Sequence, residues 1–132
     1  MSLDYRSFHL NLLSHAYNNL LRSHPFDDDA MSAEDADFLQ GLHDLIEAGQ
    51  SEQADFIDRG QALLATLVRR YPEHVPLVPR DLFWFFGGEC LHFMPDEEIA
   101  LFQLLDEQRF DAERAGEPFN YEEARANIKG LH

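Results

Sequence analysis

The amino-acid sequence predicts an all-α protein, a single compact bundle of five to six helices with no sheet, forming one domain over residues 1–132. Three observations predict this. Apolar residues recur with the period of a helix that buries one face. Prolines and glycines fall at the ends of these segments, where helices stop. The length of 132 residues is close to the commonest size of one domain, and no repeat or long linker divides the chain.

The first helix is expected over residues 4–22, where apolar residues form a broad buried face. It should stop before Pro25, because the residue preceding a proline disfavours the helical conformation. The acidic run at 27–29 is expected to be a loop. Ser32 then caps a second helix, and Gly49 is the residue expected just beyond its end.

A third helix is predicted to begin at a Ser51 cap and to end at Pro72, with Arg69 and Arg70 at the negative end of its dipole. The short connection over residues 48–51 makes the second and third helices an antiparallel hairpin. Three prolines between positions 72 and 79 predict an extended crossover from there to the next element.

The most apolar stretch, residues 82–86, fits either a buried strand or a short buried helix. We favour the helix, because no other segment offers a partner strand. Gly87 and Gly88 are expected to break it. The aromatic segment that begins at residue 82 continues beyond these two glycines as far as Phe93.

Pro95 is expected to open a long helix, with acidic residues in the first turn that suit its positive end. Gly116 should close this helix. Asn120 is predicted to cap a short last helix that ends at Gly130, in a capping box with Glu123.

The net charge of −15 disfavours binding to nucleic acid or to an anionic membrane, and it favours basic partners or cations. No stretch approaches the length of about 20 apolar residues that spans a bilayer. A signal peptide begins with positively charged residues, whereas residues 1–6 include the acidic Asp4, so we expect no signal peptide here. The only cysteine, Cys90, suits a reducing compartment, so we expect a cytoplasmic protein. Arginine makes up all of the basic residues but Lys129, which suggests a bacterial genome rich in GC.

The pair His43-Asp44 lies inside the second predicted helix. It resembles the metal signature of HD-domain phosphohydrolases, with His15 as the upstream ligand and Asp96 or Asp106 as the distal one. That resemblance implies an all-helical enzyme whose divalent metal activates water for attack at phosphorus. Where that family has a glycine-containing turn, this chain continues a helix. A solvated histidine beside a surface aspartate is the alternative interpretation.

Two further groups of residues are candidate sites. Glu89 and His92 have the Glu-x-x-His spacing of half a di-iron site, although such a site needs two copies of the motif and two more glutamates. The alternative is a solvated Glu89 with His92 at the edge of the aromatic cluster. Cys90 lies between Phe86 and Phe93, so we expect a buried thiol with a raised pKa and low reactivity.

The aromatic residues of the 82–93 segment are too close together to share one side of a helix. They form either the centre of the core or an exposed patch that another chain covers. Aromatic side chains are enriched at interfaces, so the interface candidates are Phe83, Trp84, Phe86 and Phe93.

The sequence therefore favours a cytoplasmic helical protein that binds another protein, as a homodimer or with a different partner. We expect no catalytic site, cofactor or metal, since no polar constellation or phosphate-binding loop stands out. The alternative is a metal-dependent phosphohydrolase of HD type that uses His43 and Asp44.

Overall fold

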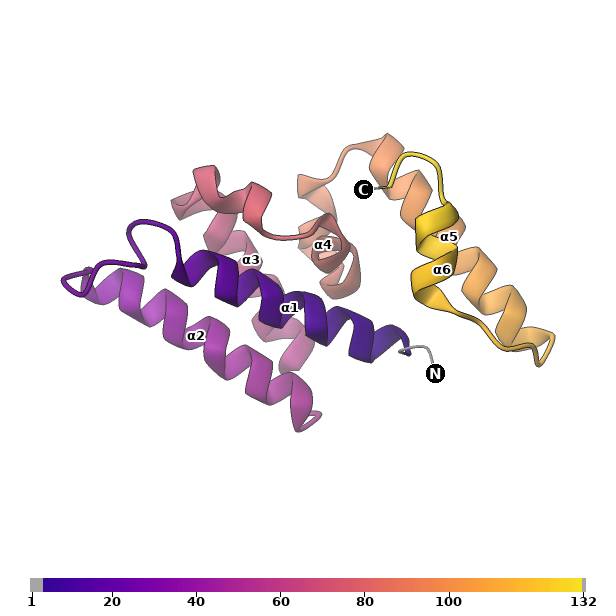
Figure 1. Ribbon diagram of the computed structural model, residues 1–132, viewed down its shortest axis with the longest axis horizontal. Helices are drawn as coiled ribbons and strands as arrows, with labels where there is room; N and C mark the ends of the chain where they lie inside the picture. The colour runs from indigo at the N-terminus through magenta and orange to yellow at the C-terminus, as the bar shows by residue number, and fades with distance from the viewer. Residues whose placement is uncertain (1–3, 132) are drawn as a thin grey trace.

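A computed structural model (Figure 1) describes residues 4–131, and in that range the chain forms six α-helices, two short 3₁₀ helices and no β-strand. This confirms the all-α prediction. The outer limits of the expected domain, residues 1–3 and 132, lie outside the described residues. The elements are α1 (Tyr5–Leu21), α2 (Ala33–Gln50), α3 (Phe56–Arg70), η1 (Pro72–Leu77), α4 (Arg80–Phe86), η2 (Gly88–Phe93), α5 (Asp96–Arg114) and α6 (Tyr121–Asn127).

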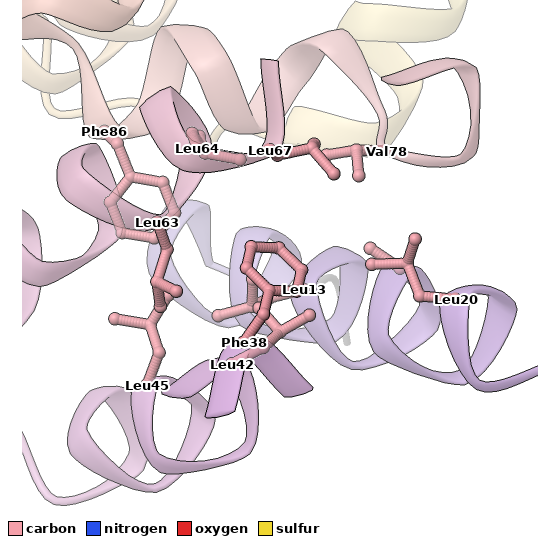
Figure 2. Close-up of a pocket in the computed structure, with 11 residues that line it drawn as sticks. Leu13, Leu20, Phe38, Leu42, Leu45, Leu63, Leu64, Leu67, Val78 and Phe86 are labelled. Carbon is pink, nitrogen blue, oxygen red and sulfur yellow. The ribbon is translucent and has the colours of Figure 1, made fainter. Parts of the chain in front are cut away.

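Helices α1, α2 and α3 form the larger part of the molecule. Helix α2 packs against both α1 and α3, and Figure 1 shows α1 and α2 running side by side. Figure 2 shows side chains from the three helices pointing into a shared apolar interior. A cavity in this interior has a volume of only about 10 Å³, barely the size of one water. The lining is Leu13, Ala16, Leu20, Phe38, Leu42, Leu45, Leu63, Leu64, Leu67, Val78 and Phe86.

Two of the predicted helix caps are confirmed. The hydroxyl of Ser32 accepts a hydrogen bond from the backbone N–H of Asp35 at 3.1 Å, at the start of α2. The side-chain oxygen of Asn120 accepts one from the N–H of Glu123 at 3.0 Å, at the start of α6. Each bond satisfies an N–H that the first helical turn leaves without an intrahelical partner.

The predicted boundary between the second and third helices is wrong. Gly49 lies inside α2 and is buried, and Ser51 caps the end of α2 instead of the start of α3. A Cβ at Gly49 would lie 2.6 Å from Leu10 and 2.8 Å from the ring of Phe56. The glycine is therefore needed for close packing of the helix and not to end it. The chain reverses at residues 51–55.

Two other boundaries also differ from expectation. Residues 72–77 form the 3₁₀ helix η1 and not an extended crossover, with Pro72 in its first turn, where a missing N–H costs nothing. Helix α6 ends at Asn127 and not at Gly130. Pro72, Pro95 and Gly116 mark the ends of α3, the start of α5 and the end of α5 as predicted.

Helix α4 contacts α1, α3 and α5, so it lies at the centre of the molecule. The predicted glycine break follows it: Gly87 and Gly88 have φ angles of 64° and 56°, a region that residues with a Cβ rarely adopt. Helix α3 approaches closely at Gly60, where a Cβ would lie 2.1 Å from the ring of Phe86.

Helices α5 and α6 lie together at one end of the molecule (Figure 1) and share a second, smaller hydrophobic cluster. Leu105, Tyr121 and Ile128 are its buried members, and side chains from the beginning of α1 pack against it. Phe102 of α5 belongs to the main core instead. Within residues 4–131, no helix combines the length and hydropathy needed to cross a membrane.

Candidate binding site at the junction of α1, α4, α5 and α6

The aromatic segment is mostly core and only partly surface. Phe83 and Phe86 are 0% and 2% exposed, which corrects the expectation that these two rings face a partner. Helix α4 contacts α1, α3 and α5, so these two rings pack against neighbouring helices instead of facing solvent. Trp84 and Phe93 are half-buried. The Trp84 ring stacks on Phe102, with 5.9 Å between ring centroids.

The His43-Asp44 pair lies on the outside of α2. The Nδ1 atom of His43 is 3.7 Å from Asp44 and its Nε2 is 3.9 Å from Glu47, and these three side chains form a compact group of metal-ligand type. Among the described residues, neither His15 nor a distal aspartate joins them. All three residues come from one helix, so the structure does not assemble the metal ligands that the HD-type interpretation requires.

The other two predicted groups differ from each other in outcome. Glu89 and His92 are both exposed on the 3₁₀ helix η2, and neither belongs to a group of metal-ligand type in residues 4–131. Cys90 is 1% exposed, and burial raises the pKa of its thiol to about 11, with a smaller contribution from Glu89. The predicted burial of this thiol is confirmed.

A polar cluster that sequence reasoning missed begins at His9. This side chain is 0% exposed, and its ring stacks on Phe85 at a centroid distance of 4.6 Å. Its Nδ1 lies 2.7 Å from the carbonyl oxygen of Tyr5, which can only accept, so Nδ1 carries the hydrogen. Burial lowers the pKa of His9, so the ring is neutral and Nε2 holds a lone pair.

A buried ion pair joins α4 to α6 beside this histidine. Asp81 is 2% exposed, and both of its carboxylate oxygens accept hydrogen bonds from the guanidinium of Arg125, one of them at 2.8 Å. The same carboxylate raises the pKa of Arg125. A paired arrangement of this kind keeps an otherwise costly buried charge in place.

A second chain of contacts joins α4 to α5 and α1. The indole N–H of Trp84 donates to Asp106 at 3.0 Å, and Asp106 also accepts from Arg109 at 3.4 Å. The guanidinium of Arg109 lies 3.8 Å from the centre of the Tyr5 ring. Burial, together with the charge of Asp106, raises the pKa of Tyr5 to about 12.

Three buried polar atoms of this junction have no hydrogen-bond partner: Nε2 of His9, Nε of Arg109 and the hydroxyl of Tyr121. Tyr121 is 2% exposed and touches the rings of Tyr5, Phe8 and His9. Burial raises the pKa of its hydroxyl, which therefore stays protonated. Buried polar atoms without partners are uncommon in folded proteins, so this concentration marks the junction.

An open cleft of about 270 Å³ lies against the junction and is called here the α1–α5 cleft. Aromatic rings and carboxylates line it together. Three carboxylates face one guanidinium, which leaves an excess of two negative charges. Its lining residues are Asp4, Tyr5, Arg109, Glu113, Glu117, Phe119 and Tyr121.

The signal for this junction in the sequence was weak. His9 lies between two apolar stripes of the first helix, and Asp81 directly precedes the apolar run 82–86. A charge that interrupts an apolar segment indicates a buried partner elsewhere. Nothing local identifies that partner as Arg125, which is 44 residues away.

Residues 1–130 match a family model described as PA2817-like. No curated protein and no solved structure matches the chain. The match includes every helix that contributes to the junction and to the α1–α5 cleft.

Proposed function

The chain belongs to the PA2817-like family, and from its structure we propose that it acts by binding a positively charged protein and not by catalysing a reaction. The family description names no reaction or ligand. The proposal therefore depends on where the charges of this molecule lie.

The observation that carries the proposal is that most arginines already contact an oxygen atom of the same chain. The Arg6 guanidinium donates to the carbonyl oxygen of Gly49 at 2.6 Å. The other engaged arginines each contact a carboxylate of the same chain, and these are Arg59, Arg70, Arg80, Arg109, Arg114 and Arg125.

The carboxylates are distributed in the opposite way. All acidic residues are exposed except Asp35, Asp44, Asp81, Glu98 and Asp106. The net charge of −15 therefore resides on the surface. Complementary charge steers association and penalises partners of the same sign, so such a surface favours a basic protein over nucleic acid or an anionic membrane.

A homodimer is a second form of the same activity, and the exposed apolar residues of α5 support it. Leu104 and Phe110 are 44% and 43% exposed, the two largest fractions among the large apolar side chains that the structure exposes. These two residues replace Phe83 and Phe86 as candidates for a contact between copies. Sedimentation of the wild type against Leu104→Ser and Phe110→Ser tests this, and a monomeric wild type at micromolar concentration contradicts it.

The single buried cysteine supports a cytoplasmic location.

The phosphohydrolase alternative has less support. It needs a metal held by His43 and Asp44 together with ligands from other helices, whereas the third member of their group is Glu47 from the same helix. Metal analysis of the purified protein and of His43→Ala separates the two functions. Stoichiometric metal that is lost in the variant would favour the enzyme.

The binding proposal is tested with a tagged chain expressed in its own host. Each protein that co-purifies is itself purified and titrated with the chain. We expect at least one basic protein to bind, with a Kd that rises about tenfold between about 50 and about 300 mM salt, because salt screens the attraction between surface charges.

The contribution of surface charge to this binding is measured with a variant in which residues 27–29 are Asn instead of Asp. Asparagine keeps the size of the side chain and removes three exposed charges. The matched control replaces Gln103 and Gln108 by Ala, which alters two exposed side chains without changing charge. If every partner that binds is acidic or neutral, or if binding is insensitive to salt, the proposal is wrong.

A further inference from the structure

We propose that the α1–α5 cleft binds an alkylammonium group, and that its natural occupant is a lysine side chain of the basic partner. This inference rests on the proposed function, because it names the group and the place that such a partner uses. The aromatic rings, the charges and the volume of the cleft support it.

The aromatic lining has the chemistry of a cation site. The rings of Tyr5 and Tyr121 meet edge to face at a centroid distance of 5.2 Å, and those of Phe119 and Tyr121 meet in the same way at 6.4 Å. Rings set at large angles to one another present several faces to one ligand. The electron-rich face of an aromatic ring attracts a cation that lies within about 6 Å of its centre.

The protein already uses one of these faces in this way. The Arg109 guanidinium lies 3.8 Å from the centre of the Tyr5 ring. It also contacts Phe110 at 4.5 Å. The junction therefore accommodates an organic cation beside its aromatic rings.

The charge of the cleft selects the sign of the ligand. Asp4, Glu113 and Glu117 outnumber the single guanidinium of Arg109, so a second cation is attracted and an anion is repelled. All three carboxylates belong to exposed residues, so an incoming ligand can displace the water around them and contact them directly.

The volume of the cleft limits the size of the cation. About 270 Å³ lies just below the range of about 300–1,000 Å³ that is typical of small-molecule pockets, so one side chain suits the cleft better than a whole cofactor. Tyr121 lines the cleft together with Tyr5 and Phe119.

The test uses NMR titration of the full chain labelled with ¹⁵N. The first probe is lysine blocked at both backbone ends, and the second is the norleucine analogue, which has a similar chain without the ammonium group. We expect the lysine probe to shift the amide signals of Tyr5, Glu113, Glu117 and Phe119 at millimolar concentration. The norleucine analogue should leave them in place. A third probe, n-pentylamine, carries a single charge and separates a free amine from a lysine side chain.

The matched variants are Glu113→Gln with Glu117→Gln, and Glu97→Gln with Glu107→Gln as the control. All four glutamates are exposed, but only the first pair lines the cleft. The cleft variant should bind the lysine probe about fivefold more weakly, since each exposed charge contributes a modest attraction. The control variant should bind it as the wild type does.

Three results overturn the inference. One is a set of shifts spread over the acidic surface that both double variants reduce equally. Another is an absence of shifts in the cleft while a purified basic partner still binds, which would leave the proposed function intact. If n-pentylamine, which carries one charge as blocked lysine does, binds more than tenfold tighter than blocked lysine, the occupant is a free amine and the assignment to a partner's lysine is wrong.

Discussion

The ion pair between Asp81 and Arg125 provides the sharpest test of how the molecule is held together. Replacing Arg125 by Met keeps much of the length of the side chain and removes its charge. The carboxylate of Asp81, which is 2% exposed, then loses both hydrogen bonds from the guanidinium. Breaking a buried pair in this way costs about 3–5 kcal/mol, mainly because an uncompensated charge stays buried.

The loss is measured by urea unfolding, with the fluorescence of the single tryptophan, Trp84, as the signal. For a domain of this size the free energy of unfolding falls by about 2 kcal/mol per molar urea, so the midpoint should drop by about 2 M. The double variant Asp81→Leu with Arg125→Met removes both charges and should recover at least about 2 kcal/mol relative to Arg125→Met alone.

Either of two results would show that Asp81 and Arg125 do not form a coupled, buried ion pair. The first is a loss below about 1 kcal/mol in Arg125→Met, the value of a solvent-exposed pair. The second is a double variant whose loss equals the sum of the two single losses, because additivity means that the two residues are not coupled.

Three further predictions concern His9, Gly60 and Cys90. Burial lowers the pKa of His9 below its ordinary value of 6.5, so the unfolded chain takes up the proton first and stability falls as the pH drops below about 6.5. Between about pH 7.5 and 5.5 the wild type should lose about 1 kcal/mol more than His9→Asn in urea unfolding, and equal losses would contradict this. Gly60→Ala should cost about 1–3 kcal/mol, because its Cβ would lie 2.1 Å from Phe86, whereas the control Gly41→Ala meets only a flexible leucine at 3.3 Å and should cost under about 1 kcal/mol. Cys90, whose thiol has a pKa of about 11, should react with Ellman's reagent at about pH 8 only as fast as the protein unfolds, and reaction at the rate of a free thiol would contradict its burial.

The parts of the fold that the sequence predicted depend on local chemistry. Ser32 and Asn120 cap helices because their side-chain oxygens bond to an N–H three residues ahead. Pro95 precedes a helix whose first turn is acidic. Each of these signals acts within one helical turn, so it can be recognised without knowledge of the rest of the chain.

Gly49 shows where local reasoning fails. A glycine near the end of an apolar helical pattern usually marks its termination. Here it lets Leu10 and Phe56 approach the backbone of α2, and that requirement comes from two other helices. The second and third helices were therefore identified correctly, while their boundary was misplaced.

The candidate site was beyond prediction for the same reason. His9, Asp81 and Arg125 come from three helices, and the contacts between them are set by how those helices pack. The sequence did suggest an acidic protein with basic partners. It could not show that Arg125 pairs with Asp81, since pairing across 44 residues leaves no periodic pattern.

The two hydrophobic clusters have a consequence for exchange with solvent. Leu105, Tyr121 and Ile128 are buried in the smaller cluster, while most of the apolar core belongs to α1–α4. A group of helices with its own small cluster opens at a lower free energy than the main core. Amide protons of α6 and of the second half of α5 should therefore exchange through partial openings, at times when α2 and α3 remain protected. Any partner that contacts both α1 and α5 would close this route, so slowed exchange in α6 would register its arrival even where it touches no residue of that helix.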